Sequence, residues 1–295
     1  MKPMFEATNL SKSFDGTYAL SGVSLSLCNP SIVGLVGRNG SGKTTLIGHM
    51  AGLLLPSEGG ATTLGCATAK LGARELEQIG YVPDDPVFIN WMTVEQHLEY
   101  IATFYPRWDA ERERRLCERL ELGLRAKVSA LSAGDRQKLA IVLAFGHHPT
   151  FILLDEPLSH LDPMIREEFL RFLMDMVAED EATVVVSSHI LHDIERIVDQ
   201  VVCLDSGVVA ADAALDDLKD EFAEWRVTST AGALPAVFAE PFVLRQEVAG
   251  LMARLIVRRA SAHRASFESA HRVTVTETSL NLTEMFPFLL RRDVQ

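Results

Sequence analysis

Nine consecutive residues have the types and spacing needed to hold a chain of phosphates. Positions 37–45 read Gly-Arg-Asn-Gly-Ser-Gly-Lys-Thr-Thr. The positions that such a loop requires are Gly37, Gly42, Lys43 and Thr44. Glycines let backbone N–H groups curl around an anion, and a following helix adds its positive dipole end. We expect Lys43 to neutralise the β- and γ-phosphates and the Thr44 hydroxyl to bind Mg²⁺. The other expected contacts are Arg38, Asn39, Gly40, Ser41 and Thr45.

The segments on either side of this loop are those that its chemistry needs. Residues 31–36 (Ser-Ile-Val-Gly-Leu-Val) are typical of a buried strand, and residues 45–50 are typical of the start of a helix. A chance match would rarely carry both flanking elements. The sequence therefore predicts a binding site for a nucleoside triphosphate.

Two carboxylates follow a second apolar run, Phe151-Ile-Leu-Leu. A carboxylate at a strand tip beside a phosphate loop holds the Mg²⁺ shell, and we assign Asp155 to it. The adjacent Glu156 is the candidate general base that polarises an attacking water. The alternative is an acidic turn after a core strand, which the neighbouring phosphate loop disfavours.

A histidine ends a third apolar run, Thr183-Val-Val-Val-Ser-Ser. Alone, His189 would be interpreted as a hydrogen-bonded structural residue. At the end of a strand on the same sheet edge as Lys43 and Asp155, it can reach a γ-phosphate. Position therefore favours a functional role.

A short polar motif opens a helix expected from Arg136 to about Phe145. It consists of Ser132, Ala133, Gly134 and Asp135. The exposed start of this helix has no obvious partner within the chain. Taken alone, the motif is typical of an ordinary serine-capped helix.

Composition excludes several classes of protein. The chain has 295 residues, 47% of them hydrophobic, and a net charge of −12 without a long basic run. The hydrophobic content is enough to form a large core, and the acidic charge does not favour binding of nucleic acid. The four cysteines, at 28, 66, 117 and 203, are too dispersed for a disulfide framework or zinc site. They favour reduced thiols in a cytoplasmic protein.

Neither a signal peptide nor a membrane span is expected. The first residues hold no apolar stretch. Residues 16–37 are uncharged and long enough to span a membrane, but serine, glycine and Pro30 interrupt them. We interpret this segment as two short strands joined by a turn.

The remaining pattern predicts an α/β fold. Runs of Val, Ile and Leu without alternation favour strands buried on both faces, as in a parallel sheet covered by helices. The expected strands are 5–10, 23–27, 32–36, 80–82, 151–154, 183–187 and 201–204. Together with the phosphate loop, this pattern predicts a P-loop NTPase with a mostly parallel sheet core, to which we expect an antiparallel β edge to be added.

Two domains are expected along the chain. Residues 1–221 would form the nucleotide-binding domain, with a helical subdomain at about 85–148. Within it, Thr93 would cap an amphipathic helix, and the charged helix from Asp109 would present a solvated face. Residues 222–295 would form a small α+β extension, with strands near 225–228, 251–257 and 272–276. A helix over 279–290, interrupted at Pro287, would close it.

The order of these motifs resembles that of the ABC (ATP-binding cassette) ATPases over roughly the first 220 residues. In that family two nucleotide-binding domains stack head to tail, and each ATP lies between one phosphate loop and the partner's signature motif. The resemblance implies that residues 37–45 bind ATP in cis and that Ser132 and Gly134 close over the partner's γ-phosphate. It also implies that Glu156 is the base and His189 the switch histidine.

Two further residues take roles from the same resemblance. Asp162 ends Ser-His-Leu-Asp, which resembles the loop by which each subunit senses the other's site. Phe14 stands where the family stacks an aromatic ring on adenine. Tyr18 is a less favoured substitute, and either ring could equally be core.

Four positions depart from the family pattern, the mildest being His160 in place of the usual glycine of the subunit-sensing loop. Asp84 replaces the usual glutamine; it could approach Mg²⁺, but it adds negative charge beside a triphosphate. Ala133 and Asp135 replace the more usual glycine and glutamine of the signature. Because Ser132 and Gly134 are retained, the resemblance still implies hydrolysis, which these departures can slow.

The stretches around Trp91 and Trp108 resemble the stand-alone ATPases of bacterial ABC-2-type exporters. This implies a separate integral membrane permease, a second ATPase subunit (a homodimer is favoured), and a place on the inner face of the cell membrane. Packing of the helical subdomain would also account for both tryptophans. The transported substrate is not readable.

Three other functions fit the sequence less well. A non-transport ABC ATPase acting on DNA or ribosomes is disfavoured, because the chain has no long coiled-coil insertion, second cassette or basic run. A regulatory ATPase with slow hydrolysis is motivated by Asp84 and Asp135. A P-loop kinase or GTPase would explain neither the signature nor His189.

Overall fold

The computed structural model describes residues 3–28 and 30–290, so the outermost residues of both expected domains lie outside it. The chain forms two compact units, Met1–Asp212 and Ala213–Gln295. The sequence predicts a boundary after residue 221, whereas in the structure the short helix α8 (Leu215–Glu221) belongs to the second unit.

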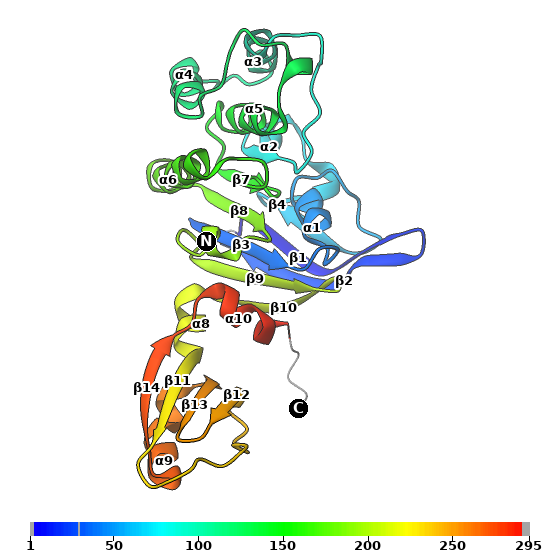
Figure 1. Ribbon diagram of the computed structural model, residues 1–295. Helices are drawn as coiled ribbons and strands as arrows, with labels where there is room; N and C mark the ends of the chain where they lie inside the picture. Colours follow the sequence, from blue (N-terminus) through cyan, green and yellow to red (C-terminus); the bar gives the residue numbers. More distant parts are fainter. Residues whose placement is uncertain (1–2, 29, 291–295) are drawn as a thin grey trace. The chain divides into compact units, whose positions relative to one another are not determined.

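The first unit alternates strands and helices (Figure 1). Its strands are β1 (Phe5–Phe14), β2 (Thr17–Leu27), β3 (Ser31–Gly37), β4 (Glu58–Thr63), β5 (Cys66–Ala67), β6 (Ile79–Val82), β7 (Phe151–Leu154), β8 (Thr183–Ser188), β9 (Gln200–Asp205) and β10 (Val208–Ala214, which runs across the boundary). Its α-helices are α1 (Lys43–Met50), α2 (Ala73–Leu76), α3 (Val94–Ala102), α4 (Ala110–Arg119), α5 (Ala133–Phe145), α6 (Pro163–Asp180) and α7 (Leu191–Ile194).

A six-stranded sheet in the order β10-β9-β3-β8-β7-β6 forms the centre of this unit. The pairs β9–β3, β3–β8, β8–β7 and β7–β6 are parallel. Strands β7 and β8 are buried at every residue, as their unbroken apolar runs predict. Because parallel strands end at one edge of the sheet, the residues after β3, β7 and β8 meet there.

The antiparallel part is a separate four-stranded sheet in the order β2-β1-β4-β5. Its strands β1 and β2 are longer than expected, because Asp15 and Gly16, both with positive φ, form a two-residue turn between them. Helix α1 and apolar residues of both sheets share one core, which includes Phe5, Leu27 and Ile47. The α/β P-loop architecture is confirmed.

The uncharged segment 16–37 forms all of β2 and all of β3, the two strands that its sequence predicts. In the described part of the chain, no helix combines the length and apolar character that crossing a membrane requires.

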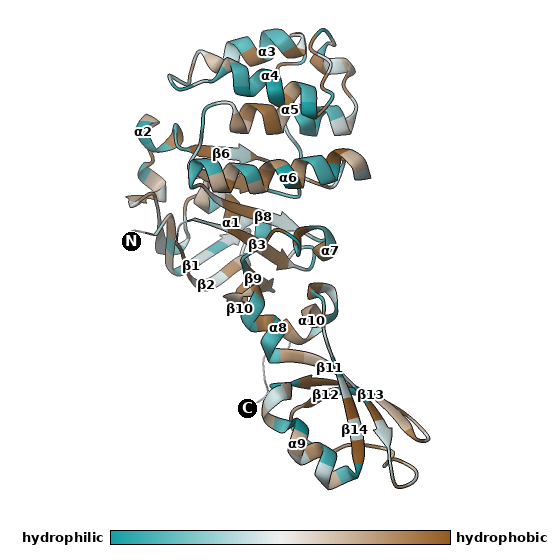
Figure 2. Cartoon of the chain, turned by 90° about the vertical axis from the view of Figure 1, so that its left-hand side faces the viewer, coloured by the Kyte–Doolittle hydropathy of each residue, from teal (hydrophilic) through white to brown (hydrophobic). Residues whose placement is uncertain are grey.

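Side-chain caps position the helices of the helical subdomain. Thr93 accepts a hydrogen bond from the Gln96 N–H, and Asp109 caps α4 in the same way. Helix α5 begins at Ala133, three residues before the expected start, because Ser132 is its N-cap. Figure 2 shows hydrophobic residues over much of α5, whereas α4 is coloured mostly hydrophilic.

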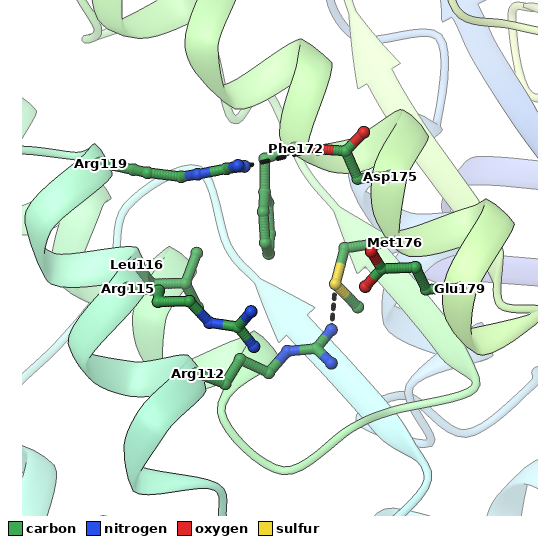
Figure 3. A pocket seen from close by; sticks show the side chains of 8 residues that line it. All are labelled: Arg112, Arg115, Leu116, Arg119, Phe172, Asp175, Met176 and Glu179. Carbon is green, nitrogen blue, oxygen red and sulfur yellow. Dashed lines mark hydrogen bonds and ion pairs between the residues drawn. The ribbon is translucent and has the colours of Figure 1, made fainter.

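One charged residue of α4 does not lie on the solvated face that the sequence predicts for this helix. Arg112 is buried, and its guanidinium contacts Asp180 of α6 at 2.8 Å. Arg119 lies 3.5 Å from Asp175 on the same helix. These arginines border a cavity of about 70 Å³ between α4 and α6 (Figure 3). The ion pair with Asp180 of α6 allows Arg112 to be buried at a position where the sequence predicts exposure to solvent.

The two tryptophans of the subdomain have different environments. The Trp108 ring packs against Gly146, where an added Cβ would lie 2.7 Å from the ring, and its N–H donates to Glu113. Trp91 is 73% exposed. Packing therefore accounts for Trp108 but not for Trp91.

The second unit is an α+β structure. Its elements after α8 are β11 (Phe222–Ser229), β12 (Val243–Ala249), β13 (Met252–Arg258), α9 (Ala260–His271), β14 (Val273–Ser279) and α10 (Leu282–Leu289). The antiparallel sheet has the order β12-β13-β11-β14 and buries one face, including Trp225 and Leu255, with Phe267 of α9.

Pro287 does not interrupt the closing helix as expected. It lies inside α10, which continues to Leu289. The helix is held at its start by reciprocal hydrogen bonds between Asn281 and Glu284, and at its far end by the buried Leu289. Capping and burial offset the backbone hydrogen bond that proline removes.

Candidate nucleotide site

The phosphate loop joins the end of β3 to the start of α1. Gly40 and Gly42 have φ of 78° and 106°, in the region that side chains disfavour. A Cβ on Gly42 would lie 2.5 Å from the Ala19 carbonyl oxygen, and one on Gly37 would lie 2.5 Å from that of Leu204. Neighbouring backbone therefore requires glycine at both positions.

Lys43 is the first residue of α1, and its side chain folds back over the loop. Its Nζ donates to the carbonyl oxygens of Gly37 at 3.0 Å and Arg38 at 3.4 Å. The same ammonium lies 3.9 Å from Glu156 Oε1. With only 7% of its surface exposed, Lys43 is a buried cation held by the loop itself.

The Asp155 carboxylate is buried at the tip of β7. Its Oδ1 accepts a hydrogen bond of 2.7 Å from the Ser187 hydroxyl, while its Oδ2 has no partner among the described residues. A buried carboxylate oxygen without a partner is costly unless a ligand satisfies it. Ser187 was missed by sequence reasoning; its only signal was a serine near the end of the third apolar run.

Glu156 and His189 form a hydrogen-bonded pair. Glu156 Oε2 lies 2.7 Å from His189 Nδ1 and 3.3 Å from the His189 backbone N. Glu156 itself has a φ of 48°, an unusual value for a residue with a side chain. Its backbone N–H donates to Ser187 Oγ at 2.9 Å, which helps to hold this turn. The structure thus brings together Lys43, Asp155, Glu156 and His189.

The residues at this edge fit a magnesium ion that phosphates help to hold. Among the residues that the structure describes, no group of three or more His, Cys, Asp or Glu side chains could bind a metal. The free Oδ2 of Asp155 and the exposed hydroxyl-bearing Thr44 offer oxygen ligands. Mg²⁺ prefers such a set, with one or two carboxylates completed by phosphates and water.

Asp84 lies beyond the end of β6, in reach of the same charges. Partial burial and the negative charges of Asp155 and Glu156 raise the pKa of Asp84, while His160 opposes the shift. Asp84 thus adds a third carboxylate to the electrostatics of this edge.

The signature residues interact with one another. The Ser132 hydroxyl accepts a hydrogen bond from the Asp135 N–H at 3.1 Å and donates to the Asp135 carboxylate at 2.8 Å. A Cβ on Gly134 would lie 2.8 Å from the His160 carbonyl oxygen. Among the described residues, no hydrogen bond or ion pair joins Ser132 or Asp135 to Lys43, Asp155 or Glu156.

The last two predicted residues lie on other segments. Asp162 caps α6 by accepting from Met164 N at 3.1 Å. Phe14 ends β1, is 47% exposed and has the Lys12 ammonium 5.0 Å from its ring centre. The hydroxyl of Tyr18 donates a hydrogen bond to Glu58 at 3.0 Å, which holds the Tyr18 side chain in place. Phe14 is therefore the favoured ring of the two for a contact with adenine.

Comparisons with known proteins complete this description. The pattern of the ABC transporter family matches residues 20–159. The ABC transporter ATP-binding protein YtrB of Bacillus subtilis (strain 168) is 30% identical over 284 residues, which cover 96% of this chain and 97% of YtrB. The chain belongs to the ABC transporter ATP-binding proteins. ATP binding and ATP hydrolysis are the activities of this ABC ATPase.

Other relatives agree with this assignment. The bacitracin transport ATP-binding protein BcrA of Bacillus licheniformis is 30% identical, covering 74% of this chain and 72% of its own length. A solved ATP-binding subunit of an ABC transporter is 33% identical with a TM-score of 0.66, covering 73% and 92%. A dimeric ATP-binding cassette bound to ADP and Pi is 26% identical with a TM-score of 0.65, covering 72% and 99%.

Proposed function

We propose that this ABC ATPase drives export of a substrate through a separate membrane permease by ATP-dependent closure of a homodimer. The observation that carries the proposal is the division of the site. Lys43, Asp155, Glu156 and His189 lie together, whereas the signature helix that begins after Ser132 makes no polar contact with them among the described residues. A second copy would bring its signature to the open side, as in the stacked dimers of the family.

Each residue of the cluster has a proposed task. The loop 37–45 wraps the phosphates, and Lys43 exchanges its contacts with Gly37 and Arg38 for contacts with them. Thr44 and Asp155 would hold Mg²⁺, which neutralises phosphate charge when bound. Glu156 takes the proton of the attacking water, and its contact with His189 orients it.

The signature and the adenine contact complete the proposed site. Ser132 and Gly134 would close over the partner's γ-phosphate with the positive end of α5 behind them. For this, the Ser132 hydroxyl must turn from the Asp135 carboxylate toward phosphate. Phe14 would stack on adenine, and Asp162 would report the state of the partner's site.

The loop after β6 is the proposed contact with the permease. Val87 and Trp91 are 88% and 73% exposed, and they follow Asp84 closely in sequence. Large apolar side chains exposed in one short loop are typical of a protein interface. This contact would place the ATPase at the inner face of the cell membrane.

Trp91→Asp should reduce retention on membranes. With Mg-ATP present, full-length protein mixed with membranes from its own source should sediment with them. Since a buried aromatic anchor typically contributes about 2 kcal/mol, the variant should bind at least about tenfold more weakly. Val237→Asp, which changes an equally exposed apolar residue of the second unit, is the matched control. Equal retention of both variants would exclude this loop as the contact.

A slowly hydrolysing regulatory ATPase is the second candidate, and Asp84 is the observation that favours it. Asp84→Gln should raise ATP turnover, because it removes a negative charge beside the triphosphate. Because solvent screens the repulsion between two charges at a protein surface, removing the Asp84 charge should lower the activation free energy by about 1 kcal/mol, which is roughly fivefold in rate. Because its pKa is raised, Asp84 takes up a proton at a higher pH than an ordinary aspartate does. The ratio of the Asp84→Gln rate to the wild-type rate should therefore fall toward one as the pH is lowered.

Steady-state phosphate release between pH 6 and pH 8 measures this ratio. A gain in rate would support a site that is deliberately slowed. A clear loss would instead identify Asp84 as a ligand of the metal or its water.

A further inference from the structure

The sheet of the second unit has two unlike faces. One face packs on α9 through Trp225, Leu255 and their neighbours. On the other face, α10 covers only one end, where Phe288 stacks on Phe222 with ring centres 6.4 Å apart. The rest of this face is an open groove of about 880 Å³, lined by residues of all four strands. That volume lies in the range of ligand sites.

Two arginines lie directly opposite each other in the middle of this groove. Arg226 of β11 pairs in register with Arg254 of β13. Like charges at such a position destabilise a sheet. The Glu224 carboxylate, which is only 5% exposed, receives a hydrogen bond of 3.1 Å from Arg226 and one of 2.7 Å from Arg254. One buried carboxylate thus holds both guanidinium groups in place.

Both guanidinium groups keep free donors. Arg226 uses only Nε, and Arg254 uses Nε and Nη2, so in the described part of the chain the other Nη groups have no hydrogen-bond partner. The buried Glu224 balances one of the two positive charges. Glu247, opposite Arg254 on β12, also lines the groove, and its carboxylate is paired with Arg245 at 3.0 Å. The nearby Glu284 lies 3.9 Å from Arg254, but its carboxylate already accepts a hydrogen bond at the N terminus of α10. The charged residues of the lining therefore balance, and the free Nη donors of Arg226 and Arg254 can hold one carboxylate.

Apolar surface lies one step along the strands from the arginines. Met252 is 64% exposed, and it pairs across β12 and β13 with the exposed Ala249. On β11, Thr228 lies opposite Met252 and adds a methyl group. A ligand that reaches from the arginines to Met252 therefore needs one anionic end and an apolar body.

We propose that this groove binds a small amphipathic carboxylate, with its carboxylate on Arg226 and Arg254 and its apolar body on Met252. A phosphate monoester carries more than one negative charge near neutral pH, which Glu224 and Glu247 in the lining repel more strongly than a single charge. An acidic peptide would likewise meet the carboxylates of Glu247 and Glu284. A second copy placed on the same face would set arginine pair against arginine pair.

Titration calorimetry with octanoate on the full-length protein, without nucleotide, tests this site. We expect saturable binding to one site. Arg226→Gln should weaken it at least tenfold while Glu224 keeps Arg254 as its partner. Met252→Gln should weaken it several-fold, because the apolar contact is lost while both arginines remain. Arg272→Gln, which removes the same charge from an exposed position of the same unit, should leave it unchanged.

Other results would overturn the proposal. Equal affinity for octanoate and the uncharged octanamide would show that no carboxylate is recognised. Tighter binding of octyl phosphate would identify a phosphate site. Unchanged binding in Arg226→Gln, or no binding at all, would place the ligand elsewhere or exclude it. Concentration-dependent dimers that Arg226→Gln abolishes would assign the face to a second copy.

Discussion

Glu156→Gln is expected to abolish steady-state ATP hydrolysis while ATP binding is retained. The amide keeps the shape of the side chain and can still contact His189, but it cannot take a proton from water. Loss of a general base typically lowers the rate by about 10² to 10⁴. Phosphate release and equilibrium binding of ATP, measured on the same preparation, separate the two effects. Glu95→Gln, an exposed change on α3, is the control.

The same variant should accumulate a closed dimer. Because hydrolysis no longer resets the composite site, light-scattering chromatography with Mg-ATP should show a shift from monomer to dimer. Adding Ser132→Asp should abolish the shift, since aspartate still caps α5 but places a negative charge against the partner's γ-phosphate. Normal turnover in Glu156→Gln would refute the assigned base.

A persistent monomer that still binds ATP would have a different meaning. It would show that the homodimer is insufficient, and that another ATPase subunit or the permease is needed for closure. The hydrogen bond from the Ser132 hydroxyl to the Asp135 carboxylate suggests a second reason for a persistent monomer. It would weaken the contact of the signature with the partner's phosphate. If Asp135→Asn, added to Glu156→Gln, restores the dimer, that cause is identified.

Lys43→Ala should remove most of the affinity for ATP. In the structure the Lys43 ammonium is buried and contacts the Gly37 and Arg38 carbonyl groups, so it is already positioned for phosphates. A charge-assisted hydrogen bond contributes about 1.5–3 kcal/mol, which corresponds to a loss of roughly 10- to 100-fold in affinity. Hydrolysis should fall further, because the transferred phosphoryl group also loses its cation.

Equilibrium binding of a fluorescent ATP analogue would measure the Lys43→Ala effect. Lys70→Ala removes the same charge from an exposed residue and should bind normally. Thermal unfolding without nucleotide shows whether the fold survives. Unchanged affinity in a folded Lys43→Ala protein would contradict the proposed phosphate contact.

The sequence alone determined the phosphate loop, the Asp155–Glu156 pair and the seven principal strands. These features are local: glycine spacing, unbroken apolar runs and cap residues act within a few neighbours along the chain. The requirement for glycine at positions 37 and 42 could be predicted from the same local motif. The backbone atoms with which a larger side chain would clash nevertheless belong to distant segments. The sequence also predicted that these motifs meet at one edge of the sheet, because the carboxyl ends of parallel strands lie at the same edge.

Tertiary structure alone decided the contacts between distant segments. It brought Ser187 to the Asp155 carboxylate, buried Arg112 against α6, and left Trp91 exposed while Trp108 packs on Gly146. The pair of Arg226 and Arg254 likewise depends on the register of two strands some 28 positions apart in sequence. Apart from the place of Ser187 near the end of an apolar run, these features leave no periodic or local signal, because each depends on which residue a partner element presents once the chain has folded.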